Sequence, residues 1–142
     1  MNTFIEYKFI NHNNTIILLF NIKQEQPTAF EWTCAVEELK EHMAMFKEKN
    51  IEFAFIFDVR IMGLLSIARI KEFVNLMSSM TILLESKLIC TSVVSEGNMV
   101  KSLFEIVKLF YNTKKPLKII NTMDEAYLFI DENKSELLNV FK

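Results

Sequence analysis

The residues of this sequence whose types and spacing could do chemistry gather between positions 58 and 69. Asp58 comes directly after the apolar run 51–57, and Arg60 follows it closely. Ligands of open α/β sheets bind beyond the carboxyl ends of the strands, so this carboxylate and guanidinium could bind a ligand or a partner there. The structural alternative is that Asp58 caps the loop or pairs with Arg60 or Arg69.

Ser66 also has two interpretations. It stands where a helix is expected to begin, and a serine there caps the free N–H groups of the first turn. The same position favours negative charge, because the helix dipole and the free N–H groups both attract it. Ser66 is therefore a candidate phosphoacceptor as well as a candidate helix cap, and a phosphate there would change a docking surface.

The other residue types associated with catalysis occur in no recognisable arrangement. His12 lies in a polar turn, and His42 follows Glu38 by four residues, a spacing that predicts a surface pair on one helix. The two glycines, Gly63 and Gly97, are too few for a phosphate-binding loop of the dinucleotide or P-loop type. The sequence names no catalytic residue and no cofactor.

Length and composition fit one domain over residues 1–142. Apolar residues make up 51% of the chain, enough for a substantial core, and the formal net charge of −2 argues against binding to a nucleic-acid backbone. Cys34 and Cys90 lie in apolar patterns without Cys-x-x-Cys spacing, so we expect reduced, buried thiols and no metal. No secretory signal and no membrane span are predicted, which favours the cytoplasm.

Hydrophobic periodicity predicts strands alternating with helices after a starting hairpin. The expected strands cover residues 4–10, 15–22, 51–58, 87–94 and 116–120. The first expected helix begins with a capping box at Thr28 and Glu31 and ends near Asn50, and the second runs from Ser66 to about residue 80 or a little beyond. The third covers residues 99–112, and the fourth begins with a second capping box at 122–125. We expect a polar break at 131–136 and a short amphipathic tail within 131–142. The order ββαβαβαβα implies a mostly parallel mixed sheet of about five strands with about four covering helices.

The predicted helix at 99–112 has an unusually wide apolar face. Met99, Ile106 and Leu109 lie beside its main apolar stripe. Such a helix is either buried on two sides or offered to a partner. Both interpretations stay open, as they do for the apolar residues of the tail.

Three local patterns, with this order of elements, resemble a STAS-type domain. Residues 53–58 read as a buried strand ending in an acidic residue, Ser66 opens the next helix, and residues 117–126 read Leu-Lys-Ile-Ile-Asn-Thr-Met-Asp-Glu-Ala. That class has the SpoIIAA-like fold and includes bacterial anti-sigma factor antagonists and the cytoplasmic tails of sulfate transporters. Residues 63–68 read Gly-Leu-Leu-Ser-Ile-Ala, whereas regulatory members carry Asp-Ser-Ser-Gly or similar, so the chain resembles a divergent member.

We therefore expect a non-enzymatic protein-interaction or regulatory module with a STAS-like fold. Its partner would be another protein or a second copy, as in a homodimer, bound through residues 58–69 and the wide apolar face of 99–110. The alternative is a small-ligand domain that holds a lipid-like or nucleotide-like molecule between sheet and helices, with Asp58, Arg60 and Arg69 orienting its head group.

Overall fold

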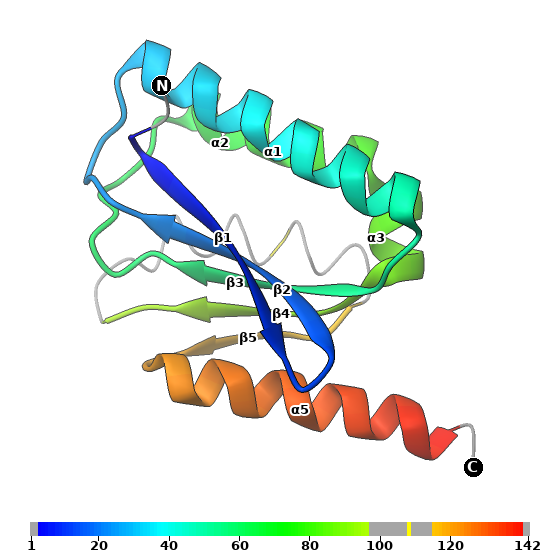
Figure 1. The fold of residues 1–142 in the computed structure, drawn as a ribbon. Helices are drawn as coiled ribbons and strands as arrows, with labels where there is room; N and C mark the ends of the chain where they lie inside the picture. The colour runs from blue at the N-terminus through cyan, green and yellow to red at the C-terminus, as the bar shows by residue number, and fades with distance from the viewer. Residues whose placement is uncertain (1–2, 97–107, 109–114, 141–142) are drawn as a thin grey trace.

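The computed structural model describes residues 3–96, 108 and 115–140. Within these residues one sheet has the strand order β1-β2-β3-β4-β5, and helices cover both of its faces (Figure 1). The strands are β1 (Ile5–His12), β2 (Thr15–Ile22), β3 (Phe53–Asp58), β4 (Leu88–Val94) and β5 (Leu117–Ile120); the helices are α1 (Ala29–Lys49), α2 (Ile67–Ser79), α3 (Thr81–Lys87) and α5 (Met123–Val140). β1 and β2 are antiparallel and the other neighbours are parallel, so the predicted fold class is confirmed.

The starting hairpin turns on two asparagines. Asn13 and Asn14 have φ values of 49° and 65°, in the left-handed region, and His12 faces Thr15 across the turn. A two-residue turn with both central residues left-handed matches the right-handed twist of the flanking strands, and asparagine tolerates this conformation. The sequence predicts a turn over residues 11–14; the turn is confirmed at Asn13 and Asn14, whereas Asn11 and His12 belong to β1.

The two faces of the sheet carry different cores because side chains alternate along each strand. β3 is buried along its whole length and sends its three phenylalanines to the face under α1 and α2, and Ala54 and Ile56 to the face covered by α5. The first face is aromatic, with Phe46 of α1 stacked on Phe53 at a centroid distance of 4.2 Å. On the second face burial raises the pKa of the Cys90 thiol to about 12.

Helix α1 begins and ends where local sequence signals place it. The Thr28 hydroxyl accepts from the Glu31 N–H at 3.1 Å, and the Glu31 carboxylate accepts from the Thr28 N–H at 2.9 Å. Each contact satisfies a backbone donor that the first helical turn leaves open, so the predicted capping box is confirmed. Asn50, with φ 54°, adopts the left-handed conformation that ends the helix.

The helix predicted from Ser66 to about residue 80 continues as a second, separate helix. α2 ends at Ser79 and α3 begins at Thr81, with Met80 between them. The Ser79 hydroxyl donates to the Leu76 carbonyl at 2.6 Å, and the Thr81 hydroxyl donates to the Ser78 carbonyl at 2.7 Å. Such side-chain bonds compete with the helical backbone ladder, and two of them flank the break at Met80.

Helix α5 contradicts the predicted break at residues 131–136, because it continues without interruption from Met123 to Val140. That segment contains no proline or glycine. Asn133 donates from its side chain to the Phe129 carbonyl one turn earlier, at 2.8 Å, and so stays within the helix. The polar residues therefore belong to a helix rather than a loop; Glu132 is exposed, and Asp131, Asn133 and Lys134 are half-buried. The helix predicted at 99–112, with Met99, Ile106 and Leu109, lies outside the described residues.

Candidate functional site

The candidate site lies at the carboxyl end of β3. Asp58, its last residue, is level with Val94 at the end of β4, and the Val59 N–H donates to the Val94 carbonyl at 3.0 Å. Residues 59–66, here called the carboxyl-end loop, then lead to α2. In doubly wound sheets, nucleotides bind in a crevice at the point where the strand order reverses. The described strands β2 to β5 lie in the sheet in their chain order, so they form no such crevice. The loop itself is therefore the main feature at this end.

Asp58 and Arg60 form a two-pronged ion pair. Nε of Arg60 donates to Oδ1 at 2.9 Å and Nη2 donates to Oδ2 at 2.8 Å, while the Arg60 backbone N–H also donates to Oδ1 at 3.3 Å. Burial by itself raises the pKa of Asp58, but the hydrogen bonds and the charge of Arg60 outweigh it and hold that pKa below its usual value. The pairing predicted as the structural alternative is therefore present, with Arg60 and not Arg69 as the partner.

Arg69 is held away from Asp58 by contacts with the segment before α1. Its Nη1 donates to the Pro27 carbonyl at 3.1 Å, and its guanidinium carbon lies 6.0 Å from the centre of the Trp32 ring. The Trp32 indole in turn donates to Glu72 at 2.7 Å. The guanidinium thus ties the start of α2 to α1 and does not join Asp58 in a binding site for one head group.

Ser66 is the N-cap of α2. Its hydroxyl accepts from the Arg69 backbone N–H at 3.2 Å, and the residue is exposed. The predicted cap is confirmed. Phosphorylation of Ser66 stays a prediction, with an accessible hydroxyl at a helix N-terminus in its favour.

Gly63 lets the carboxyl-end loop lie directly against the segment before α1. Its N–H donates to the Glu25 carbonyl at 2.8 Å. A β-carbon at this position would stand 3.0 Å from that carbonyl oxygen and 2.9 Å from Nε2 of Gln26, which donates to the Leu64 carbonyl. A side chain at position 63 would therefore push the two segments apart. No local pattern in the sequence revealed this close approach of Gly63 to residues 25–26.

The apolar side chains of the carboxyl-end loop and its junction with α2 point in two directions. Ile61, Leu64 and Ile67 are 51%, 61% and 73% exposed. Met62 is buried and Leu65 is half-buried. An irregular loop has no fixed period, so the sequence could not show which of these residues face solvent. These three exposed side chains, Ile61, Leu64 and Ile67, are defined here as the loop patch; they follow the Asp58–Arg60 pair in the chain.

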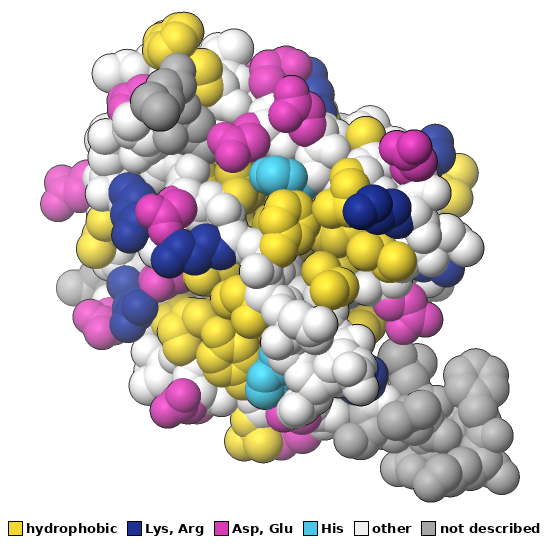
Figure 2. All heavy atoms as spheres, in the orientation of Figure 1, with side chains coloured by type: hydrophobic (Ala, Val, Ile, Leu, Met, Phe, Trp, Pro, Cys, Tyr) yellow, Lys and Arg dark blue, Asp and Glu magenta, His cyan; other side chains and the backbone are white. Residues whose placement is uncertain are grey.

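The remaining surface gives no sign of a large field of one charge on the face shown in Figure 2, where acidic and basic side chains are interspersed. Binding to a nucleic-acid backbone needs clustered positive charge, and this one face shows no such cluster. Among the described residues no helix is both long enough and apolar enough to cross a bilayer.

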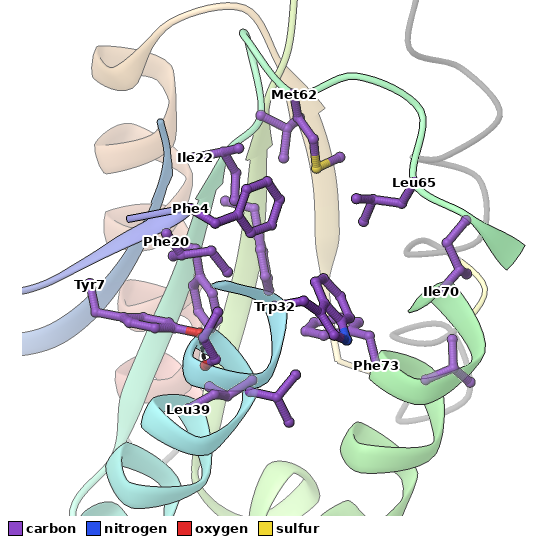
Figure 3. A pocket seen from close by; sticks show the side chains of 16 residues that line it. Phe4, Tyr7, Phe20, Ile22, Trp32, Leu39, Met62, Leu65, Ile70 and Phe73 are labelled. Carbon is purple, nitrogen blue, oxygen red and sulfur yellow. Dashed lines mark hydrogen bonds between the residues drawn. The ribbon is translucent and has the colours of Figure 1, made fainter. Parts of the chain in front are cut away.

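An apolar, partly open cavity of about 50 Å³ lies beneath the loop, between the sheet and helices α1 and α2. Figure 3 shows Met62 and Leu65 of the loop, Trp32 of α1 and Phe73 of α2 around it. Enclosed apolar spaces of about 150 Å³ admit benzene, so this one is too small for a lipid in the conformation observed. The small-ligand alternative expected from the sequence also placed its ligand between the sheet and the helices.

The two histidines make structural contacts. His42 has its Nε2 3.8 Å from Oε1 of Glu38, the predicted surface pair, and its ring lies edge-on between Tyr7 and Phe9 at centroid distances of 5.0 and 4.9 Å. Burial lowers the pKa of His42 more than the nearby glutamates raise it. His12 pairs with a carboxylate on α5, far along the chain from the loop patch.

Comparison with known proteins identifies the fold. No family model and no curated protein matches the sequence. The chain is similar to the crystal structure of an uncharacterized protein of the DUF3478 family from Shewanella loihica PV-4, which has a SpoIIAA-like fold. The TM-score is 0.65, the match covers 89% of this chain and 93% of that one, and 13% of residues are identical. This chain has a SpoIIAA-like fold. The SpoIIAA-like architecture agrees with the STAS-type resemblance found in the sequence.

Proposed function

We propose that this chain is a non-enzymatic interaction module that binds a protein partner through the loop patch. The observation that carries the proposal is the exposure of Ile61, Leu64 and Ile67, each by half or more, within seven residues. Single exposed apolar residues are normal on protein surfaces, whereas a cluster marks an interaction site.

The backbone of the loop supports this interpretation. Gly63 and Leu64 are both hydrogen-bonded to residues 25–26, so the apolar side chains project from a fixed support. A partner would then bind without first ordering the loop, which reduces the entropic cost of association. The Arg60 side chain is 37% exposed although it pairs with Asp58. Arginine is a residue type that is enriched at interface hot spots.

Ser66 gives the same surface a means of regulation. It lies between Leu64 and Ile67, and its hydroxyl already accepts a backbone hydrogen bond at the start of α2. A phosphate would keep that acceptor role and add nearly two negative charges at pH 7. Charge placed between two apolar contacts would oppose their burial against a partner, so we propose that phosphorylation of Ser66 releases the partner.

The proposal is tested by affinity capture from a lysate of the source cells. The wild-type chain, Ile67→Ser and Ile82→Ser serve as baits; Ile82 is an equally apolar exposed residue on α3, 86% exposed, and provides the matched control. We expect a protein captured by the wild type and by Ile82→Ser, with at least about tenfold less captured by Ile67→Ser, equivalent to about 1.4 kcal/mol of binding free energy. Equal capture by both variants would contradict the loop patch as the binding surface.

The apolar cavity favours small-ligand binding as a second candidate. Met62 and Leu65 close it from the side of the loop, so movement of the loop would enlarge it (Figure 3). Native mass spectrometry and thermal unfolding with a panel of fatty acids and nucleotides test this function. A retained ligand that is lost in Leu65→Trp, where the larger ring fills the space, would support it. No retained ligand and no thermal shift across the panel would exclude these ligand classes.

A further inference from the structure

The edge strand β1 is long, regular and without proline, although it carries the charged residues Glu6 and Lys8. It is the first strand of the sheet, and no described strand pairs with its outer side; in Figure 1 it lies nearest the viewer. Its register with β2 runs without a bulge over eight residue pairs. Natural edge strands are commonly short, bulged or interrupted by proline, because an open edge is a template for association. β1 has none of these features.

The pairing with β2 determines which backbone groups of β1 point outward. The Lys23 N–H donates to the Phe4 carbonyl at 2.8 Å, and hydrogen-bonded positions alternate along an antiparallel pair. Even-numbered residues of β1 therefore direct their N–H and C=O groups to β2. Tyr7 and Phe9 direct theirs outward, while their side chains contact His42 of α1.

We propose that a second copy of this chain pairs with β1 in antiparallel orientation about a two-fold axis at Tyr7. Tyr7 then faces Tyr7 of the second copy, and the two residues exchange N–H···O=C hydrogen bonds. Glu6 faces Lys8 of the second copy, and Lys8 faces its Glu6. These charged pairs occupy the positions without backbone hydrogen bonds, where opposing side chains approach most closely.

Charge complementarity selects both this occupant and this register. Glu6 and Lys8 now form an ion pair within the strand, Oε1 to Nζ 2.9 Å, with both side chains half-exposed. An axis at Glu6 or Lys8 would place like charges opposite each other, and an axis at Phe9 would leave both charges without an opposite partner on the facing strand. The axis at Tyr7 also places Phe9, 46% exposed, against the second copy's Ile5 side chain. This surface is separate from the loop patch, so its test does not depend on the proposed function.

Sedimentation equilibrium of charge-reversed variants over a wide concentration range tests the proposal. We expect the wild type to form a dimer, and Glu6→Lys and Lys8→Glu each to be monomeric, because each places like charges across the axis. An equimolar mixture of the two variants should form a heterodimer, since each strand then faces the opposite charge. Neither variant retains the ion pair between Glu6 and Lys8 of one chain. A heterodimer in the mixture therefore reports the charge pairs between the two chains.

Lys40→Glu is the matched control, because Lys40 forms a comparable exposed ion pair with Glu37 on α1, at 3.1 Å. It should leave the dimer unchanged, and circular dichroism checks that every variant is folded. A monomeric wild type at all concentrations would overturn the proposal. So would a dimer that persists in both single variants, or a mixture of the two that stays monomeric.

Discussion

The carboxyl-end loop and the hairpin turn lie at opposite ends of the sheet, and they differ in how their side chains are used. In the turn, His12 and Asn13 both contact the Asp131 carboxylate, at 3.0 and 3.1 Å, and Lys134 donates to the Asn13 carbonyl at 2.7 Å. The polar groups of the turn thus find their partners on α5. In the loop, the backbone is bonded within the chain but the apolar side chains of the loop patch face solvent.

The contacts of the turn stabilise the fold, whereas the exposed side chains of the loop patch do not. The contacts of the turn fix α5 against the hairpin, and the residues that make them are explained by that task. The exposed side chains of Ile61, Leu64 and Ile67 bury little surface within the chain, so they contribute little to folding. An ordered loop that presents apolar groups without a structural task is the better candidate for binding.

The largest expected effect comes from removing the support of the loop. Trp32 is buried under it, packs against Phe4 at a centroid distance of 6.1 Å, and donates to Glu72. Trp32→Ala should lower the free energy of unfolding by about 3–5 kcal/mol, measured by urea denaturation. Trp32→Phe, which keeps a ring, should cost clearly less. A loss below about 1 kcal/mol for the alanine variant would show that the loop does not rest on this ring.

Gly63→Ala should break the contact between the loop and residues 25–26. The added methyl group meets a backbone carbonyl at 3.0 Å, which cannot move as easily as the Gln26 side chain. Overpacking of this kind costs about 1–3 kcal/mol, again measurable in urea. The double variant Gly63→Ala/Gln26→Ala should recover only part of the loss. Full recovery would mean that the added methyl group clashes with the Gln26 side chain and not with the backbone carbonyl of Glu25.

Asp58→Asn tests the charged pair at the start of the carboxyl-end loop. The native pKa of Asp58 lies below its unfolded value, so its stabilising contribution is complete above about pH 4 and is lost as the pH falls through the native pKa. We expect a loss of about 1–2 kcal/mol at pH 7, since Arg60 is partly exposed and solvent weakens the pair. The variant should lose less stability than the wild type on acidification. Parallel acid-unfolding curves would contradict this assignment.

The smallest effect is expected in the turn. Asp131 lies at the surface, and exposed ion pairs contribute about 0–1 kcal/mol, so Asp131→Asn should reduce stability within that range. Partner capture should be unchanged, because the turn is far from the loop patch. Reduced capture by this variant, with stability preserved, would instead assign binding to the hairpin end and remove the contrast between the two regions.

Local signals in the sequence predicted most of the fold. The apolar run ending at Asp58, the capping box at Thr28 and the paired asparagines 13 and 14 each act through their nearest neighbours, and each formed the element expected. The continuous α5 was missed because Asp131 and Lys134, which make part of this segment polar, contact a turn more than a hundred residues earlier. No local pattern reveals such a contact.

The candidate site was predictable only in part, for the same reason. The position of Asp58 at a strand end and the cap at Ser66 followed from local patterns. The choice of Arg60 over Arg69 depends on where residues 25–32 lie, because Pro27 and Trp32 hold Arg69 away. The exposure of Ile61 and Leu64 beside the inward-facing Met62 depends on the path of an irregular loop.

Hydrogen exchange with the captured partner bound tests the central claim most directly, because it reads the loop and the turn in one sample. We predict slower amide exchange at residues 59–70 and at the neighbouring residues 25–32, with exchange at the hairpin turn, residues 11–14, unchanged. Slower exchange at the turn with an unchanged loop would contradict the claim that this protein binds its partner through the carboxyl end of β3.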